Sequence, residues 1–195
     1  MKQLLVLAGF AVLLLGLAGC QTANKGVDPA PPRGGVEVII EGGGEFPEFL
    51  VGRWKADKDG WQFVFEPDGA VSSAVISLSR VRIRPGEIIT VPMKMGGKGI
   101  FEPDQWMVHY APAGRELTVK ISLKNFYMEL GKGVVEGKST DIFAGPVSQD
   151  GKVWLVDWTS FPDYTAHTAE HPNFILSDGT DAAITKSLVF EKVEE

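Results

Sequence analysis

Two of the three histidines lie four residues apart in the segment from Asp163 to His171. On a helical turn His167 and His171 would share one face, as zinc or another divalent ion requires. Asp163 or Glu170 could complete three ligands and leave one position open. The alternative is a polar loop between two strands, because prolines bracket the segment on both sides. A divalent metal site is therefore one hypothesis for this chain.

A second segment, GKGVVEGKS from Gly131 to Ser139, invites comparison with a phosphate-binding loop. Such a loop places four residues between its first glycine and its Gly-Lys pair, whereas this segment offers five from Gly131 and three from Gly133. No helical pattern follows that could receive a phosphate at its N-terminus. We therefore reject a nucleotide site and predict that the glycines form a hairpin turn and a strand bulge.

Aromatic side chains are the third feature that could have a function. In a barrel, the inward face of each strand could line a cavity for an apolar or ring-shaped ligand. The same side chains could equally fill the core. The candidate pocket or core aromatics are Trp54, Trp61, Phe63, Phe65, Trp106, Phe126, Trp154 and Trp158.

Other enzyme signatures are missing from the sequence. It contains neither the Gly-x-Ser-x-Gly motif of a nucleophile elbow nor His-Glu-x-x-His, and Cys20 is its only cysteine. The chain has 19 basic and 25 acidic residues, a net charge of -6, which argues against nucleic acid as a partner. We expect a non-catalytic protein without a cofactor, unless the histidine segment binds a metal.

The hydrophobic pattern that must position these residues has a period of two far more often than 3.6. The clearest alternation runs over residues 117–124, and shorter ones cover 61–66, 80–84, 154–158 and 188–190. Turn sequences separate them, among them Pro-Asp-Gly at 67–69 and Asp-Gly at 150–151 and 178–179. Only Pro47 to Gly52 indicates a helical turn.

This pattern predicts an all-β domain, an antiparallel meander of about eight to ten strands that must close or stack to hide its edges. An up-and-down barrel and a two-sheet sandwich both meet that demand. Gly52-Arg53-Trp54 after a short helical turn, followed by a Phe-Glu-Pro-Asp-Gly hairpin at 65–69, resembles the start of bacterial lipocalin-like domains. The resemblance favours the barrel and implies that Trp54 closes one end, with a basic side chain from a late strand over it. Lys192 is the candidate for that basic side chain.

The N-terminus has its own organisation. Lys2 precedes an apolar stretch that is short for a membrane span, and small residues then lead to Cys20, the layout of a cleaved secretory signal. Leu17-Ala18-Gly19-Cys20 resembles the lipobox of bacterial lipoproteins, which implies cleavage before Cys20 and acylation of its thiol and amine. Gln21 stands where that family's inner-membrane retention signal usually places aspartate, which implies the outer membrane in a two-membrane cell.

The expected organisation is a cleaved signal over 1–19, a lipidated N-terminus with a Pro/Gly-rich flexible linker over 20–35, and one β domain over 36–195. The leading hypothesis is an envelope lipoprotein, anchored through acylated Cys20 and facing the periplasm, that binds a small apolar or aromatic ligand in the barrel. A second is a structural or interaction module that contacts another envelope protein, peptidoglycan or carbohydrate. A third is a metal-dependent enzyme that uses His167 and His171.

Overall fold

The computed structural model describes residues 35–76, 80–94, 96–168 and 183–194, with the backbone alone at 167 and 168. Its elements are β1 (Val36–Ile40), the 3₁₀ turn η2 (Glu48–Leu50), β2 (Gly52–Ala56), β3 (Gln62–Phe65), β4 (Val71–Val75), β5 (Arg82–Ile83), β6 (Ile89–Pro92), β7 (Lys98–Pro103), β8 (Trp106–Ala111), β9 (Glu116–Leu130), β10 (Gly133–Pro146), β11 (Val153–Thr168) and β12 (Ile184–Lys192). The described residues contain no helix long and apolar enough to cross a membrane.

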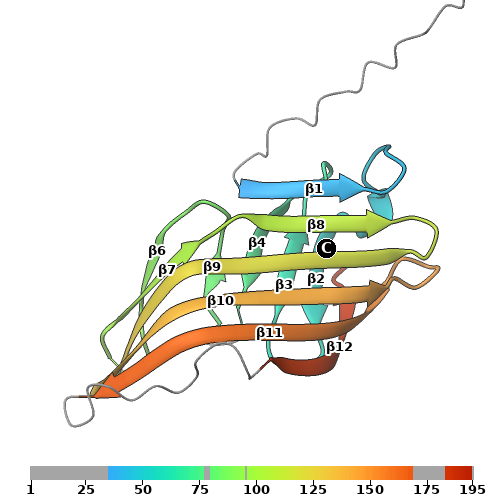
Figure 1. The fold of residues 1–195 in the computed structure, drawn as a ribbon. Helices are drawn as coiled ribbons and strands as arrows, with labels where there is room; N and C mark the ends of the chain where they lie inside the picture. The colour runs from blue at the N-terminus through green and yellow to red at the C-terminus, as the bar shows by residue number, and fades with distance from the viewer. Residues whose placement is uncertain (1–34, 77–79, 95, 169–182, 195) are drawn as a thin grey trace, which may run out of the picture. The chain divides into compact units, whose positions relative to one another are not determined.

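The strands form one curled sheet (Figure 1). Neighbouring strands follow the order β1-β8-β9-β10-β11-β12-β2-β3-β4-β5, while β6 pairs with β7 and β7 pairs with β9. β12 pairs antiparallel with β2, so the last strand of the chain is joined to the group β2, β3, β4 and β5. This pairing lets the sheet curl around its core. The predicted all-β, barrel-like fold is confirmed, and the continuity of the sheet argues against two separate layers.

Two features of the sheet go beyond the prediction. β1 pairs with β8 in parallel, from Val36 opposite Trp106 to Ile40 opposite Tyr110, so the sheet is mixed rather than wholly antiparallel. The number of described strands is twelve instead of eight to ten, because several are short: β5 contains only Arg82 and Ile83.

The predicted turns that fall within the described residues are present, and the Asp-Gly turn at 178–179 lies outside them. Residues 67–69 connect β3 to β4, and the Asp68 carboxylate accepts a hydrogen bond from the Ala70 amide at 3.1 Å. Gly69 has a φ of +84°, and a Cβ there would lie 2.6 Å from the ring of Phe46, so the turn needs glycine both for its backbone and for its packing. The predicted helical turn between Pro47 and Gly52 is η2.

The three longest strands are β9, β10 and β11, which lie side by side and bend together (Figure 1). The bend coincides with a bulge in β9: Leu123 pairs with Ser139 and Phe126 with Gly137, so that Lys124 and Asn125 face Lys138 alone. Bulges of this kind turn a strand and increase its twist. The glycine-rich segment thus forms the hairpin between β9 and β10 and takes part in the bulge, as predicted, and a strand follows it rather than a helix.

Candidate functional site

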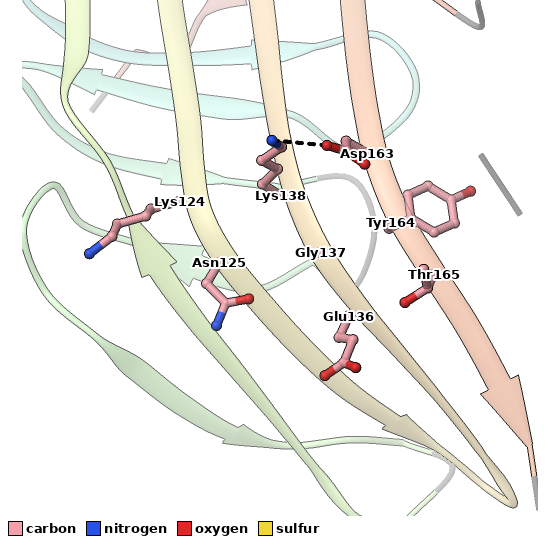
Figure 2. A pocket seen from close by; sticks show the side chains of 8 residues that line it. All are labelled: Lys124, Asn125, Glu136, Gly137, Lys138, Asp163, Tyr164 and Thr165. Atoms are coloured by element: carbon pink, nitrogen blue, oxygen red, sulfur yellow. Dashed lines mark ion pairs between the residues drawn. The ribbon is translucent and has the colours of Figure 1, made fainter. Parts of the chain in front are cut away.

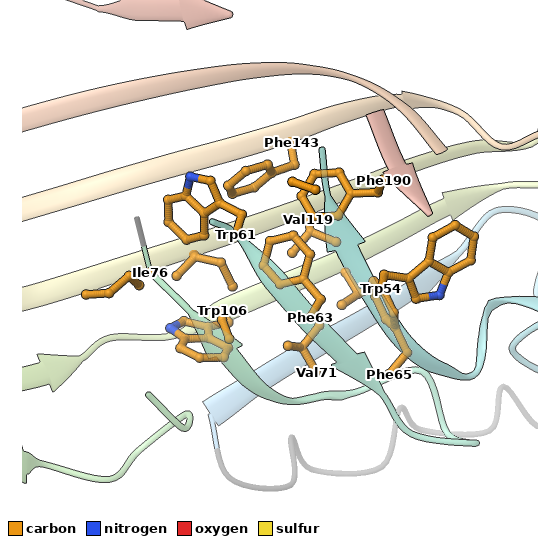
Figure 3. Packing of buried hydrophobic residues seen from close by; sticks show 14 of the residues in the cluster. Trp54, Trp61, Phe63, Phe65, Val71, Ile76, Trp106, Val119, Phe143 and Phe190 are labelled. Atoms are coloured by element: carbon orange, nitrogen blue, oxygen red, sulfur yellow. The ribbon is translucent and has the colours of Figure 1, made fainter. Parts of the chain in front are cut away.

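One half of the inner face, the side of the sheet that faces the core, is filled with aromatic rings, which we call the aromatic core (Figure 3). Phe63 lies at its centre, fully buried, with its ring centroid 4.9 Å from that of Phe143 and 5.3 Å from that of Phe190. The aromatic core consists of Trp54, Trp61, Phe63, Phe65, Phe143, Trp154 and Phe190. All eight aromatics singled out from the sequence are buried, and those in this half pack against one another.

Trp54 ends the aromatic core next to η2. Its indole Nε1 donates to the Leu50 carbonyl at 2.8 Å. Lys192 on β12 lies opposite Trp54 in the register, and its ammonium donates to the Phe49 carbonyl at 2.9 Å. A basic side chain from the last strand thus reaches the neighbourhood of Trp54, as the resemblance implied, and its ammonium binds the short turn that leads into β2.

The inner face changes from aromatic to polar two residues before Phe143 on β10. Phe143 and Asp141 have the same orientation on the strand, but Asp141 is a carboxyl group with only 7% of its surface exposed. Trp158 Nε1 donates to Asp141 Oδ1 at 2.9 Å, and the hydroxyls of Ser160 and Ser139 lie close enough to lower the pKa of this carboxyl. We call Ser139, Asp141 and Ser160 the inner polar cluster.

Burial dominates the electrostatics of this cluster. Desolvation raises the pKa of Asp141, and the hydrogen bonds from Ser160, Trp158 and Ser139 oppose that rise by stabilising the ionised form. These three partners are neutral, and within the described residues Asp141 takes part in no ion pair. A buried carboxyl without a counter-charge is costly for a fold and is a common mark of a functional site.

Trp158 stands at the boundary between the aromatic core and the inner polar cluster. Its ring is stacked with Phe143 at 6.2 Å between centroids and meets Trp61 edge-on at 5.8 Å. The ammonium of Lys186 lies 5.5 Å from the Trp158 ring centroid and is paired with Asp59 at 3.2 Å. Trp158 therefore contacts the rings on one side and the buried carboxyl on the other.

Trp61 presents a second unusual group at the same boundary. Only 2% of this residue is exposed, and its indole Nε1 is a buried donor for which the described part of the chain supplies no acceptor. Buried donors normally find a partner, because an unsatisfied one costs about 1–3 kcal/mol.

Beyond Asp141 the inner face becomes more exposed on β11 and β12, whereas Phe126 and Met128 on β9 stay buried. On β11 the exposure rises from the buried Trp158 and Ser160 to the half-buried Tyr164. On β12, Leu188 is buried, whereas Ile184, which pairs with Ser160, has 47% of its surface exposed. The inner polar cluster therefore lies between the aromatic core and the more exposed ends of β11 and β12.

The outer face carries a shallow groove at the bulge, with a volume of about 350 Å³ (Figure 2). Gly137 is one of its lining residues, and a Cβ at this position would meet the Asp163 carbonyl oxygen on β11. Lys138 and Asp163 form an ion pair across the groove at 3.0 Å. The lining is polar: Lys124, Asn125, Glu136, Gly137, Lys138, Asp163, Tyr164 and Thr165.

The predicted metal site is only partly within the described residues. Asp163 is engaged by Lys138, and the backbone at His167 belongs to strand β11, where it pairs with Val134, rather than to a helical turn. Glu170 and His171 lie outside the described residues. Among the residues that are described, no three His, Cys, Asp or Glu side chains gather as metal ligands would. The divalent site stays a prediction.

Asp141 was not among the residues predicted from the sequence, although a signal for it exists. In the run Ser139-Thr140-Asp141-Ile142-Phe143, alternation gives Asp141 the same face as Phe143. A carboxyl in phase with buried aromatics could have been identified as an inward-facing polar group.

Comparison of the chain with protein-family models, with curated proteins and with solved structures gave no match.

Proposed function

We propose that this protein is a lipid-anchored protein of the cell envelope that binds a small, mainly apolar molecule on the inner face of its barrel-like sheet, beside the inner polar cluster. The anchor rests on the lipobox-like Leu17-Ala18-Gly19-Cys20 and on the secretory pattern before it. Two acyl chains or more hold a protein firmly on a membrane, whereas one chain binds marginally. The Pro/Gly-rich segment that follows would let the domain extend away from an outer membrane into the periplasm.

The observation that carries the binding function is the buried Asp141. A sheet that needed only a filled core could place an apolar residue there at lower cost, since replacing buried charges by apolar groups is often neutral or stabilising. Instead Trp158 holds a carboxyl group, with two serines beside it, at the boundary of the aromatic core. Small-molecule sites combine mainly apolar walls with a few such fixed polar groups.

The position of the cluster also supports the proposal. The aromatic core closes one end of the inner face, and exposure increases away from it along β11 and β12. A ligand that entered from the accessible end would meet Trp158 and Asp141 before the packed rings. The aromatic core would then serve as the floor of the site rather than as its lining.

The test uses the full chain reconstituted in lipid nanodiscs, titrated with fatty acids, isoprenoids and aromatic metabolites while tryptophan emission and the melting temperature are recorded. We expect a saturable response to at least one class, with empty nanodiscs as the blank. Ser160→Phe, which fills the inner face, should abolish the response. Thr159→Phe, on the outer face of the same strand, should leave it intact. No response from the unaltered chain, or equal effects of the two variants, would contradict the proposal.

A second candidate function, contact with an envelope polymer, is favoured by the outer groove. Two lysines and two carboxylates balance within it, together with an amide and a hydroxyl, which suits a neutral, hydroxyl-rich ligand such as a glycan better than an ion. Sedimentation with purified peptidoglycan tests it. Binding that is lost in Lys138→Glu and retained in Ser160→Phe would favour the groove over the inner face.

A further inference from the structure

We propose that Asp141 is the recognition point for a protonated amine on the ligand, so that the bound molecule is an apolar or aromatic amine. This inference rests on the proposed function, because it assigns a chemical class to the ligand of the same inner face. It follows from the partners that Asp141 has, from those that it lacks, and from the rings around it.

The hydrogen bonds of Asp141 prepare it as an acceptor of positive charge. The indole N–H of Trp158 donates to the carboxyl at 2.9 Å; burial raises the pKa of Asp141, and Ser160, Trp158 and Ser139 oppose that rise by favouring the ionised form. None of these groups carries a positive charge, and within the described residues no Lys, Arg or His pairs with it. A ligand ammonium would supply the missing counter-charge, and charge-assisted hydrogen bonds are about twice as strong as neutral ones.

The rings beside Asp141 suit the rest of such a ligand. Trp158 is bound to the carboxyl through its Nε1 and is packed against Phe143 and Trp61. Indole faces attract cations, and the Lys186 ammonium already lies 5.5 Å from the Trp158 ring centroid. An apolar body could therefore pack on this wall while its ammonium reaches the carboxyl. An oxygen on the same ligand would satisfy the unpartnered Nε1 of Trp61.

Other head groups fit less well. A carboxylate or phosphate would be repelled by the ionised form of Asp141 and would supply no counter-charge to it. A neutral hydroxyl could donate to Asp141 but would leave its charge uncompensated. Lys186 does not reverse this preference, because Asp59 pairs with it at 3.2 Å.

The experiment compares three probes with one body and different head groups: 2-phenylethylamine, 2-phenylethanol and phenylacetate. The full chain in nanodiscs is titrated by calorimetry at neutral pH, with empty nanodiscs as the blank. We expect the amine to bind about 10- to 100-fold more tightly than the alcohol, the range of a hydrogen bond to a charged group, and phenylacetate to bind weakest.

Asp141→Asn should bring the amine down to the affinity of the alcohol, because the amide keeps a similar shape and an acceptor for Trp158 but loses the charge. Asp157→Asn is the matched control, since Asp157 lies on the same strand, is exposed and accepts a hydrogen bond from Ser187. It should keep the preference. The melting temperature shows whether each variant is folded, and if Asp141→Asn is not, Asp141→Glu replaces it and should weaken amine binding through misplacement of the carboxyl.

Equal affinity of the three probes, or a preference for the amine that survives Asp141→Asn, would overturn the amine inference and leave the proposed function standing. Failure of all three probes, while another class from the wider panel binds, would also overturn the amine inference alone. Failure of every probe and of the whole panel would overturn both.

Discussion

The two halves of the inner face are occupied by different kinds of side chain. In the aromatic core, rings fill the space and contact one another, and every indole N–H except that of Trp61 finds a backbone acceptor. In the inner polar cluster, a carboxyl and two hydroxyls occupy positions of the same orientation on the same strands. The first arrangement gains stability from burial. The second gives up part of that stability, and such a sacrifice is typical of binding sites.

The largest expected effect concerns the aromatic core. Phe63→Ala should lower the free energy of unfolding by about 3–5 kcal/mol, because this fully buried ring touches five others and its removal leaves a cavity. Denaturant unfolding of the full chain measures the loss. Ser160→Ala, in the inner polar cluster, should cost about 1 kcal/mol. Equal losses would mean that the two halves do not differ as described.

The bend between β10 and β11 should be the next most sensitive place. In Gly137→Ala the new methyl group would meet the Asp163 carbonyl and Tyr164, so the strands must separate locally, at a cost of about 1–3 kcal/mol. Unfolding curves give the total loss. Hydrogen exchange should show faster exchange in residues 161–165 and unchanged exchange in the aromatic core; a uniform change across the sheet would argue against a local effect.

The inner polar cluster predicts a pH dependence of stability. Because the pKa of Asp141 is raised on folding, the folded state holds the proton more tightly than the unfolded state. The carboxyl is therefore most favourable to folding below its unfolded pKa of about 4, and this contribution is lost as pH rises through the raised value.

Asp141→Asn should remove this dependence. Relative to the unaltered chain it should gain stability between acid and neutral pH, by roughly 1–2 kcal/mol, the scale of one buried polar group. Unfolding curves of both proteins over that range test the sign. A variant whose relative stability fell as pH rose would show that the ionised carboxyl stabilises the fold.

The smallest effect belongs to the outer face. Lys138→Gln breaks the ion pair between Lys138 and Asp163, in which the two side chains are 66% and 46% exposed. It should lower the free energy of unfolding by no more than about 0.5 kcal/mol. The loss should shrink further in high salt. A cost comparable to that of Gly137→Ala would show that the ion pair, rather than the close approach of the strands, holds the bend.

The sequence was sufficient for the fold where the interactions are local. Period-two alternation identified parts of β9 and β11 but not β10, and the Pro-Asp-Gly and glycine-rich turns indicated the hairpins. The break of alternation between Leu123 and Phe126 also marks the bulge in β9. The parallel pairing of β1 with β8 could not be predicted, because it joins segments about seventy residues apart whose contact depends on how the whole sheet curls.

For the candidate site the sequence was less informative. It identified the aromatics and left open whether they line a cavity or fill the core, since alternation shows which side chains face inward and not how they pack. Phe63 and its neighbours form a packed cluster. The residue that carries the proposed function is Asp141. That it has no positively charged partner can be seen only when three strands are brought together.

The most direct test of the central claim uses the tryptophans as reporters of the two halves. The indole N–H signals of the full chain, labelled with ¹⁵N-tryptophan, are followed by NMR while a ligand from the panel is added. Binding beside the inner polar cluster predicts that the signals of Trp158 and Trp61 shift, while those of Trp54 and Trp154 stay in place. Shifts confined to Trp54 and Trp154, or no saturable shift with any ligand, would contradict it.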